Sequence, residues 1–132
     1  MRNIFICLFT LGVFLNLAAQ KAPAHVGKVY TVVENRPQFI GGEMEMFKFL
    51  RDNVKYPKNS CKETGTVYYG FIVEPNGDLS HMEIKRSAGC AAYDAEGARV
   101  LALMSKGMWT AGSEKDMKVR VGYTLPIKFR LE

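Results

Sequence analysis

The chain has 132 residues, 48% of them hydrophobic, and its 18 Lys and Arg outnumber its 13 Asp and Glu to give a net charge of +5. This length suits one domain with a modest core. The basic residues are spread along the sequence rather than clustered, so we expect no nucleic-acid partner, because nucleic-acid-binding faces concentrate Lys and Arg.

The first 20 residues have the layout of a secretory signal peptide. Arg2 precedes an uncharged apolar run from Ile4 to Leu15, and the segment Leu17-Ala18-Ala19-Gln20 supplies small residues at the exit. The run is shorter than the roughly 20 residues that a spanning helix needs. We therefore expect residues 1–20 to be removed on export, with a short retained anchor as the alternative.

A lead segment and a helix come next. Residues 21–36 form the expected lead, which includes a β-prone run at Val29–Val33, and the domain itself is expected over residues 37–132. A helix is predicted from Glu43 to about Val54, and Tyr56-Pro57 ends it because a proline disfavours helical backbone in the preceding residue. Its apolar stripe is Met46, Phe47, Leu50 and Val54.

Two strands joined by a tight turn are predicted after the helix. The first alternates apolar and outward positions over Val67–Val73, and Pro75-Asn76-Gly77-Asp78 predicts a hairpin with a two-residue turn. The return strand carries Leu79, Met82 and Ile84. The irregular spacing of these three indicates a bulge near Ser80 or His81.

A second helix and a long strand complete the chain. The helix runs from Ala91 to about Lys106, and a loop around Trp109 follows it over residues 107–112. One face of the helix carries Tyr93, Gly97, Val100, Leu101 and Met104. Apolar residues then occupy every odd position from Val119 to Leu131, an unbroken period of two that predicts a strand.

This order predicts an α+β fold with an antiparallel, three- to four-stranded sheet and two helices packed on one face. Such an arrangement buries every apolar stripe. The opposite face of the sheet is expected to stay in contact with water.

The order of elements and its signposts resemble the TonB C-terminal domain family, in the form common among Bacteroidetes-type bacteria. The resemblance covers nearly all of the chain after the signal segment. It is carried by Pro37-Gln38-Phe39 with Gly41-Gly42, Tyr56-Pro57, Gly65-Thr66-Val67, Phe71-Ile72-Val73, Asn76-Gly77, Ser87-Ala88-Gly89, Tyr93-Asp94-Ala95-Glu96, Arg99-Val100, Trp109-Thr110 and the segment from Val119 to Phe129. The family usually has alanine where this chain has Gly97.

The resemblance implies a periplasmic domain that binds the TonB box of a TonB-dependent outer-membrane transporter and so serves transmembrane transport. In the family the TonB box adds as a strand beside the last strand of the domain, which suits a long exposed edge. Proteins that energise the inner membrane are further partners if the N-terminus is anchored, and a homodimer stays open. The partner-binding residues implied are Tyr56, Pro57, Val119, Arg120, Val121, Gly122, Tyr123, Thr124, Leu125, Pro126 and Ile127.

Other interpretations stay open beside this one. In one alternative, Tyr56-Pro57 only ends the helix. In another, the last strand only completes the sheet, with Arg120, Lys128 and Arg130 protecting its edge. The chain has no long Pro-rich spacer, so the alternative function is a stand-alone periplasmic interaction or structural domain with another envelope partner and no role in energy transduction.

No catalytic constellation is visible in the sequence. His81 stands alone on a strand, and the spacing of Cys61, Cys90, His81 and Asp94 lacks the CxxC or HxxxH pattern of a zinc site. We expect neither an enzyme nor a bound cofactor or metal.

Cys61 and Cys90 are predicted to form a disulfide. A two-residue turn at Asn76-Gly77 makes the numbers of facing residues sum to about 153, which places both cysteines at the open end of one hairpin. Disulfides persist in an exported protein. The alternative is two unpaired thiols, one of them beside the second helix.

The signal peptide gives the first testable prediction. The mature protein isolated from the envelope should lack about 20 N-terminal residues, because signal peptidase removes such segments. Intact mass or N-terminal sequencing measures this. Met1 retained in the membrane fraction would instead favour the anchored form.

Overall fold

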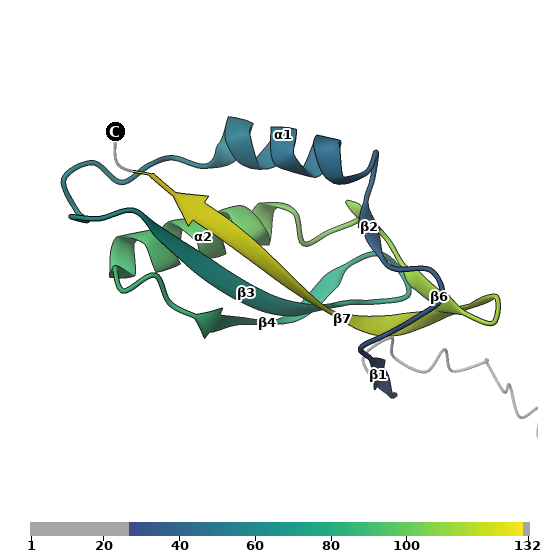
Figure 1. Ribbon diagram of the computed structural model, residues 1–132. Helices are drawn as coiled ribbons and strands as arrows, with labels where there is room; N and C mark the ends of the chain where they lie inside the picture. The colour runs from purple at the N-terminus through teal and green to yellow at the C-terminus, as the bar shows by residue number, and fades with distance from the viewer. Residues whose placement is uncertain (1–26, 131–132) are drawn as a thin grey trace, which may run out of the picture.

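The computed structural model describes residues 27–130 (Figure 1). The expected signal segment and residues 21–26 of the lead lie outside the described residues. The fold is α+β, as predicted. Its elements in chain order are β1 Val29–Tyr30, β2 Gln38–Phe39, α1 Glu43–Asn53, β3 Gly65–Val73, β4 Leu79–Arg86, α2 Ala91–Leu103, β5 Trp109–Thr110, β6 Gly112–Glu114 and β7 Met117–Phe129.

The main sheet is built around the antiparallel pair of β3 and β7. Strands follow one another in the order β1-β7-β3-β4, and β6 pairs separately with β7 to make five strands. The β3–β7 register is unbroken from Gly65 opposite Phe129 to Val73 opposite Val121. Because β1 pairs with β7 in parallel, the sheet is mixed, and it has one strand more than the predicted three or four.

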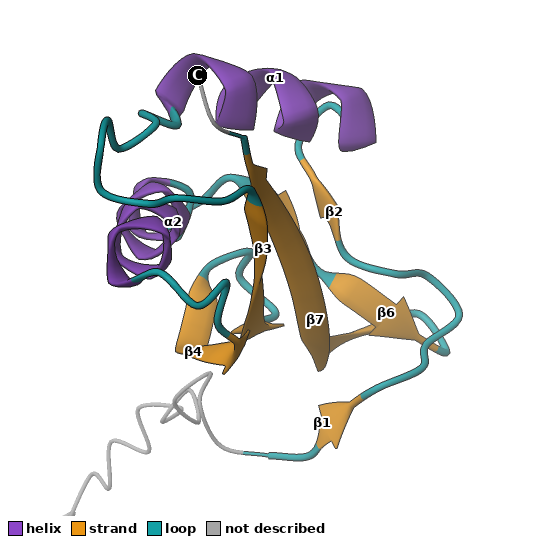
Figure 2. Ribbon diagram, turned by 60° about the vertical axis from the view of Figure 1, so that its left-hand side comes forward, coloured by secondary structure: helices purple, strands orange, loops and turns teal. Residues whose placement is uncertain are grey.

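The core forms where the odd-numbered residues of β3 and β7 meet the helices. Alternation puts these side chains on one face, and they join one hydrophobic cluster with Met46 of α1 and with residues of α2. Figure 2 shows α1 above the sheet and α2 beside β3, with β1 at the other end. The cluster residues of β3 and β7 are Val67, Tyr69, Phe71, Val73, Leu125, Ile127 and Phe129, and those of α2 are Tyr93 and Leu101.

The apolar stripe predicted for α1 is wrong at one position, Phe47. Phe47 is half exposed, whereas Met46 is buried and Phe49 packs on Phe39 with ring centroids 5.7 Å apart. The contact with Phe39 turns the helix so that position 49 takes the inward place expected for position 47.

The hairpin turn is one residue longer than predicted. Val73 faces Leu79, and the Glu74 N–H donates to the Asp78 carbonyl at 2.8 Å, so Pro75, Asn76 and Gly77 all belong to the turn. Gly77 has φ of +85° and lies against the Trp109 carbonyl. A side chain there would be strained by the backbone and would also meet that oxygen.

The predicted bulge is confirmed. The register of β4 against β3 shifts between Gly70 and Ile72, and His81 has φ of +51°. A second shift, between Tyr68 and Tyr69, was not predicted.

The segment predicted as a loop around Trp109 contains two short strands. Trp109 of β5 pairs with Phe39 of β2 in a separate two-stranded sheet, and β6 starts at Gly112. The α2 helix ends at Leu103, three residues earlier than expected, and the Ser105 carbonyl then accepts a bond from the Leu79 N–H at 2.8 Å.

Gly97 of α2 is explained by the residue beneath it. The Tyr69 ring lies where a Cβ at position 97 would stand, and its hydroxyl donates to the Asp94 carbonyl at 2.7 Å. Burial, with help from the Asp94 carboxylate, raises the pKa of Tyr69 to about 12. Gly97 therefore makes room for a tyrosine held under the helix.

Cys61 and Cys90 are joined by a disulfide, as predicted, with Cα atoms 6.0 Å apart. It fastens the segment between α1 and β3 to the first residue before α2. The Tyr93 hydroxyl donates to the Glu63 carbonyl at 2.9 Å and reinforces the same junction.

The disulfide gives the second prediction. The Cys61→Ser/Cys90→Ser double variant should lose about 3–4 kcal/mol of unfolding free energy, because the bridge closes a loop across 29 positions and restricts the unfolded chain. Urea denaturation with and without reductant measures the loss. Two thiols that alkylate before reduction in the exported protein would contradict the bridge.

Candidate peptide-binding edge

The side of β7 turned away from β3 is open along most of its length. Pairing with β1 and β6 uses only residues from Met117 to Val121. From Gly122 to Phe129, no strand within residues 27–130 pairs with this side of β7. We call this stretch the open edge. An unpaired edge presents a row of main-chain N–H and C=O groups that another extended chain can use.

Pro126 lies within the open edge, as its chemistry requires. It faces Tyr68 across the β3–β7 pair and is exposed. A proline has no N–H, so inside a sheet it is confined to edges and bulges. Thr124 lies two residues away on the same exposed row and still has its N–H.

The opposite edge of the sheet, along β4, is a poorer template. Its register breaks twice and His81 has a positive φ. Charged side chains are exposed along it, including an ion pair between Glu83 and Lys85 at 2.8 Å. Bulges and charges are devices that prevent edge pairing. Of these two edges, the β7 edge is the one that combines an unbroken register with main-chain groups that no strand of residues 27–130 pairs.

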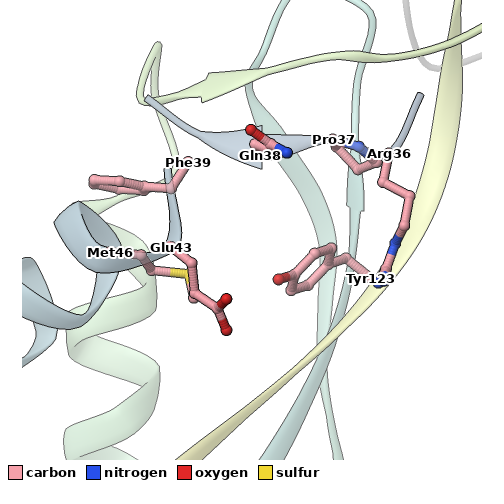
Figure 3. Close-up of a pocket in the computed structure, with 7 residues that line it drawn as sticks. All are labelled: Arg36, Pro37, Gln38, Phe39, Glu43, Met46 and Tyr123. Carbon is pink, nitrogen blue, oxygen red and sulfur yellow. The ribbon is translucent and has the colours of Figure 1, made fainter. Parts of the chain in front are cut away.

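A cavity of about 190 Å³ lies beside the start of the open edge (Figure 3). We call it the Tyr123 cavity. Buried residues form its floor, and charged or polar side chains stand around its mouth. Its lining is Arg36, Pro37, Gln38, Phe39, Glu43, Met46 and Tyr123. Arg36 and Tyr123 also line two neighbouring hollows, one under residues 31–33 and one over the outer face of the sheet.

Tyr123 is held between the core and this cavity. Its ring stacks on Phe71 with centroids 5.4 Å apart and meets Trp109 at 5.2 Å. Burial raises the pKa of the Tyr123 hydroxyl, Arg36 opposes the rise and Glu43 adds to it. Figure 3 shows Arg36 and Glu43 on opposite sides of the tyrosine ring. Neither forms an ion pair with another residue in the described range.

Arg120 does not protect an exposed edge, and this part of the prediction is wrong. It is only 8% exposed and pairs with Glu74, which is fully buried, through Nε at 2.9 Å. Its Nη1 donates to the Gly27 carbonyl at 3.0 Å, and Ser80 donates to Glu74 at 2.6 Å. The face expected to be wet is therefore covered at this end by the incoming chain.

The predicted partner-binding residues separate into two places. Val119 to Ile127 all lie on β7, and six of them, from Gly122 to Ile127, belong to the open edge. Tyr56 lies at the far end, against Phe129 with ring centroids 6.1 Å apart, and Pro57 follows it. Neither residue lines the Tyr123 cavity, so the structure does not bring them to that end of the edge.

Sequence reasoning missed the rest of the cavity. Arg36, Gln38 and Glu43 come from a loop, a two-residue strand and a helix start, and such short segments carry no periodicity. They lie close to Tyr123 because β2 pairs with β5, and no local sequence pattern predicts that pairing.

Comparison with known proteins adds no family. No protein-family model, curated protein or solved structure matches the chain, so the resemblance to the TonB C-terminal domain stays a prediction. Among residues 27–130, no helix is long and apolar enough to cross a membrane. No group of three or more potential metal ligands occurs in that part of the chain.

The buried ion pair gives the third prediction. Arg120→Met should lower the free energy of unfolding by about 3–5 kcal/mol, because it leaves the Glu74 carboxylate buried without its main charged partner. Adding Glu74→Leu should restore much of the loss, since neither charge then remains. Urea denaturation of the wild type, the Arg120→Met variant and the double variant tests this. A double variant no more stable than Arg120→Met would contradict the predicted recovery.

Proposed function

We propose that this chain is a periplasmic protein-binding domain of TonB type. The open edge takes up an extended segment of a partner as an added strand, and the partner is the TonB box of an outer-membrane transporter. The observation that carries the proposal is the open edge itself: the eight residues from Gly122 to Phe129 pair with β3 on one side and with no other strand of residues 27–130. Strand addition uses main-chain hydrogen bonds for affinity and side-chain pockets for specificity.

The contrast between the two sheet edges supports this choice. The β4 edge is bulged and charged, while β7 keeps one register with β3 over nine consecutive pairs. An added strand needs evenly spaced partners, which a twice-shifted strand does not supply. The sheet order puts β7 and β4 on different sides of β3, so occupation of one edge leaves the other unchanged.

The chemistry of the edge fits a transient peptide partner. Thr124 and Lys128 are exposed beside the free main-chain groups, and Leu125 and Ile127 are buried in the core. The strand is thus fixed from within and free along its outer side. A partner other than a transporter, recruited by the same edge, is the alternative function, and a panel of peptides separates the two.

The fourth prediction tests strand addition. Thr124→Pro should weaken binding of TonB-box peptides about fivefold or more, because the ring removes one main-chain donor from the open edge. The fold should persist, since the same strand already holds Pro126. Fluorescence anisotropy with labelled peptides measures the affinity, and circular dichroism checks the fold.

Thr124→Val is the matched control, because it keeps the N–H and the exposed position while removing only the hydroxyl. It should bind like the wild type. If folded Thr124→Pro binds every TonB-box peptide as the wild type does, the open edge is not the binding site. If the wild type binds other extended peptides but no TonB box, the edge serves a different envelope partner.

A further inference from the structure

The Tyr123 cavity lies where one side chain of an added strand would enter. A residue directly opposite Tyr123 on such a strand projects from the same face of the sheet as Tyr123 does. That face is the inner one, because Tyr123 stacks on Phe71 of the core. The cavity opens on this face, between Tyr123, β2 and the start of α1 (Figure 3).

The floor of the cavity is apolar and fixed. Phe39 is 7% exposed, Met46 is 4% exposed, and Pro37 is buried. Phe39 is held by Trp109 and Phe49, with ring centroids 5.7 Å away in both cases. An apolar side chain placed here leaves water without displacing any packed residue, which favours binding.

The size of the cavity fits one large side chain. Its volume is about 190 Å³, and an engineered apolar cavity of about 150 Å³ is large enough to bind benzene. The polar groups of Arg36, Gln38 and Glu43 are exposed around the mouth, where water reaches them. The stem of an entering side chain would pass these groups, and its tip would reach the apolar floor.

The other face of the added strand meets no such constraint. Gly122 has no side chain, and a Cβ built on it would come no closer than 3.8 Å to any neighbour, Val29 being the nearest. Side chains next to the anchored one would point to this open side, where many sizes fit. Selection by size therefore falls on the single position opposite Tyr123.

We propose that the Tyr123 cavity is an anchor pocket that receives one large apolar side chain, of leucine, methionine or phenylalanine type, from the strand added to β7. The proposal rests on strand addition at the open edge and identifies which class of segment that edge selects. Extended segments with a large apolar residue at the anchor position bind, and those with alanine or aspartate there bind weakly.

The test places a large side chain at the rim of the pocket and measures how much peptide affinity is lost. A display library of random seven-residue peptides is selected for binding to the full chain. One selected peptide is then resynthesised with Ala at each position in turn. The anchor position is the one where Ala lowers the affinity about tenfold or more, the effect expected from losing a buried apolar side chain. Glu43→Trp should lower the affinity of the parent peptide by a similar factor, because the indole occupies the cavity.

The deciding result is the combination of both changes. With Ala at the anchor position, Glu43→Trp should cause little further loss, since no side chain is left to collide with the indole. Glu45→Trp, in the same exposed first turn of α1 but outside the cavity lining, controls for an added tryptophan. Glu45→Trp should bind the parent peptide normally. Glu43→Gln removes the charge without filling the cavity, so it should cost much less affinity than Glu43→Trp does. Gln38→Phe fills the pocket from β2 and provides a second variant.

The outcomes separate this inference from the proposed function. Peptide binding that is weakened by Thr124→Pro but unaffected by Glu43→Trp and Gln38→Phe overturns the anchor pocket and leaves strand addition standing. A loss from Glu43→Trp that stays equally large with Ala at every position also overturns the pocket. Failure to select any peptide, or binding that none of these variants changes, overturns both.

Discussion

The unbroken pairing of β3 with β7 is the constraint on which the rest of the structure depends. Nine consecutive residue pairs fix which side chains of both strands point inward, because a slip of one residue would turn each of them to the other face. The same pairing uses one side of β7 and leaves its other side open beyond Val121. The core and the candidate binding edge are therefore two consequences of one register, and a change that shifts β7 would damage both.

The buried pair of Glu74 and Arg120 sets where the open edge begins. Arg120 is drawn against Glu74 and holds the Gly27 carbonyl, so the incoming chain lies beside β7 at Arg120 and Val121. Past Tyr30 the chain leaves the strand, and the edge is free from Gly122 onward. Burying two charges costs free energy unless they are paired and hydrogen-bonded, and the three hydrogen bonds that Arg120 donates to Glu74 meet that condition. The pair thus fixes where the N-terminal part of the described chain meets β7, and that contact ends before the open edge begins.

The sequence predicted those features that have a period or a short-range chemical cause. Alternation over Val119–Leu131 predicted β7, and hairpin counting placed Cys61 near Cys90 although the turn is one residue longer. All five residues of the stripe predicted for the second helix are buried, although Met104 follows the end of α2. The two-residue strands β2 and β5 are too short for any period, so the cavity that they help to build was missed. Arg120 looked like an outward residue, because a buried ion pair depends on a partner 46 positions away.

Aromatic contacts fasten both ends of the open edge from the inner face. Phe129 stacks on Tyr93 of α2 with centroids 4.7 Å apart, next to the Cys61–Cys90 bridge, and Tyr123 is held by Phe71 and Trp109. The strand between them is thereby ordered before any partner arrives, while its outer main-chain groups stay free. Binding then orders mainly the incoming segment, which reduces the entropy that association must overcome. A short peptide has few contacts with which to offset that entropy, so an edge held rigid from within suits it better than a mobile one.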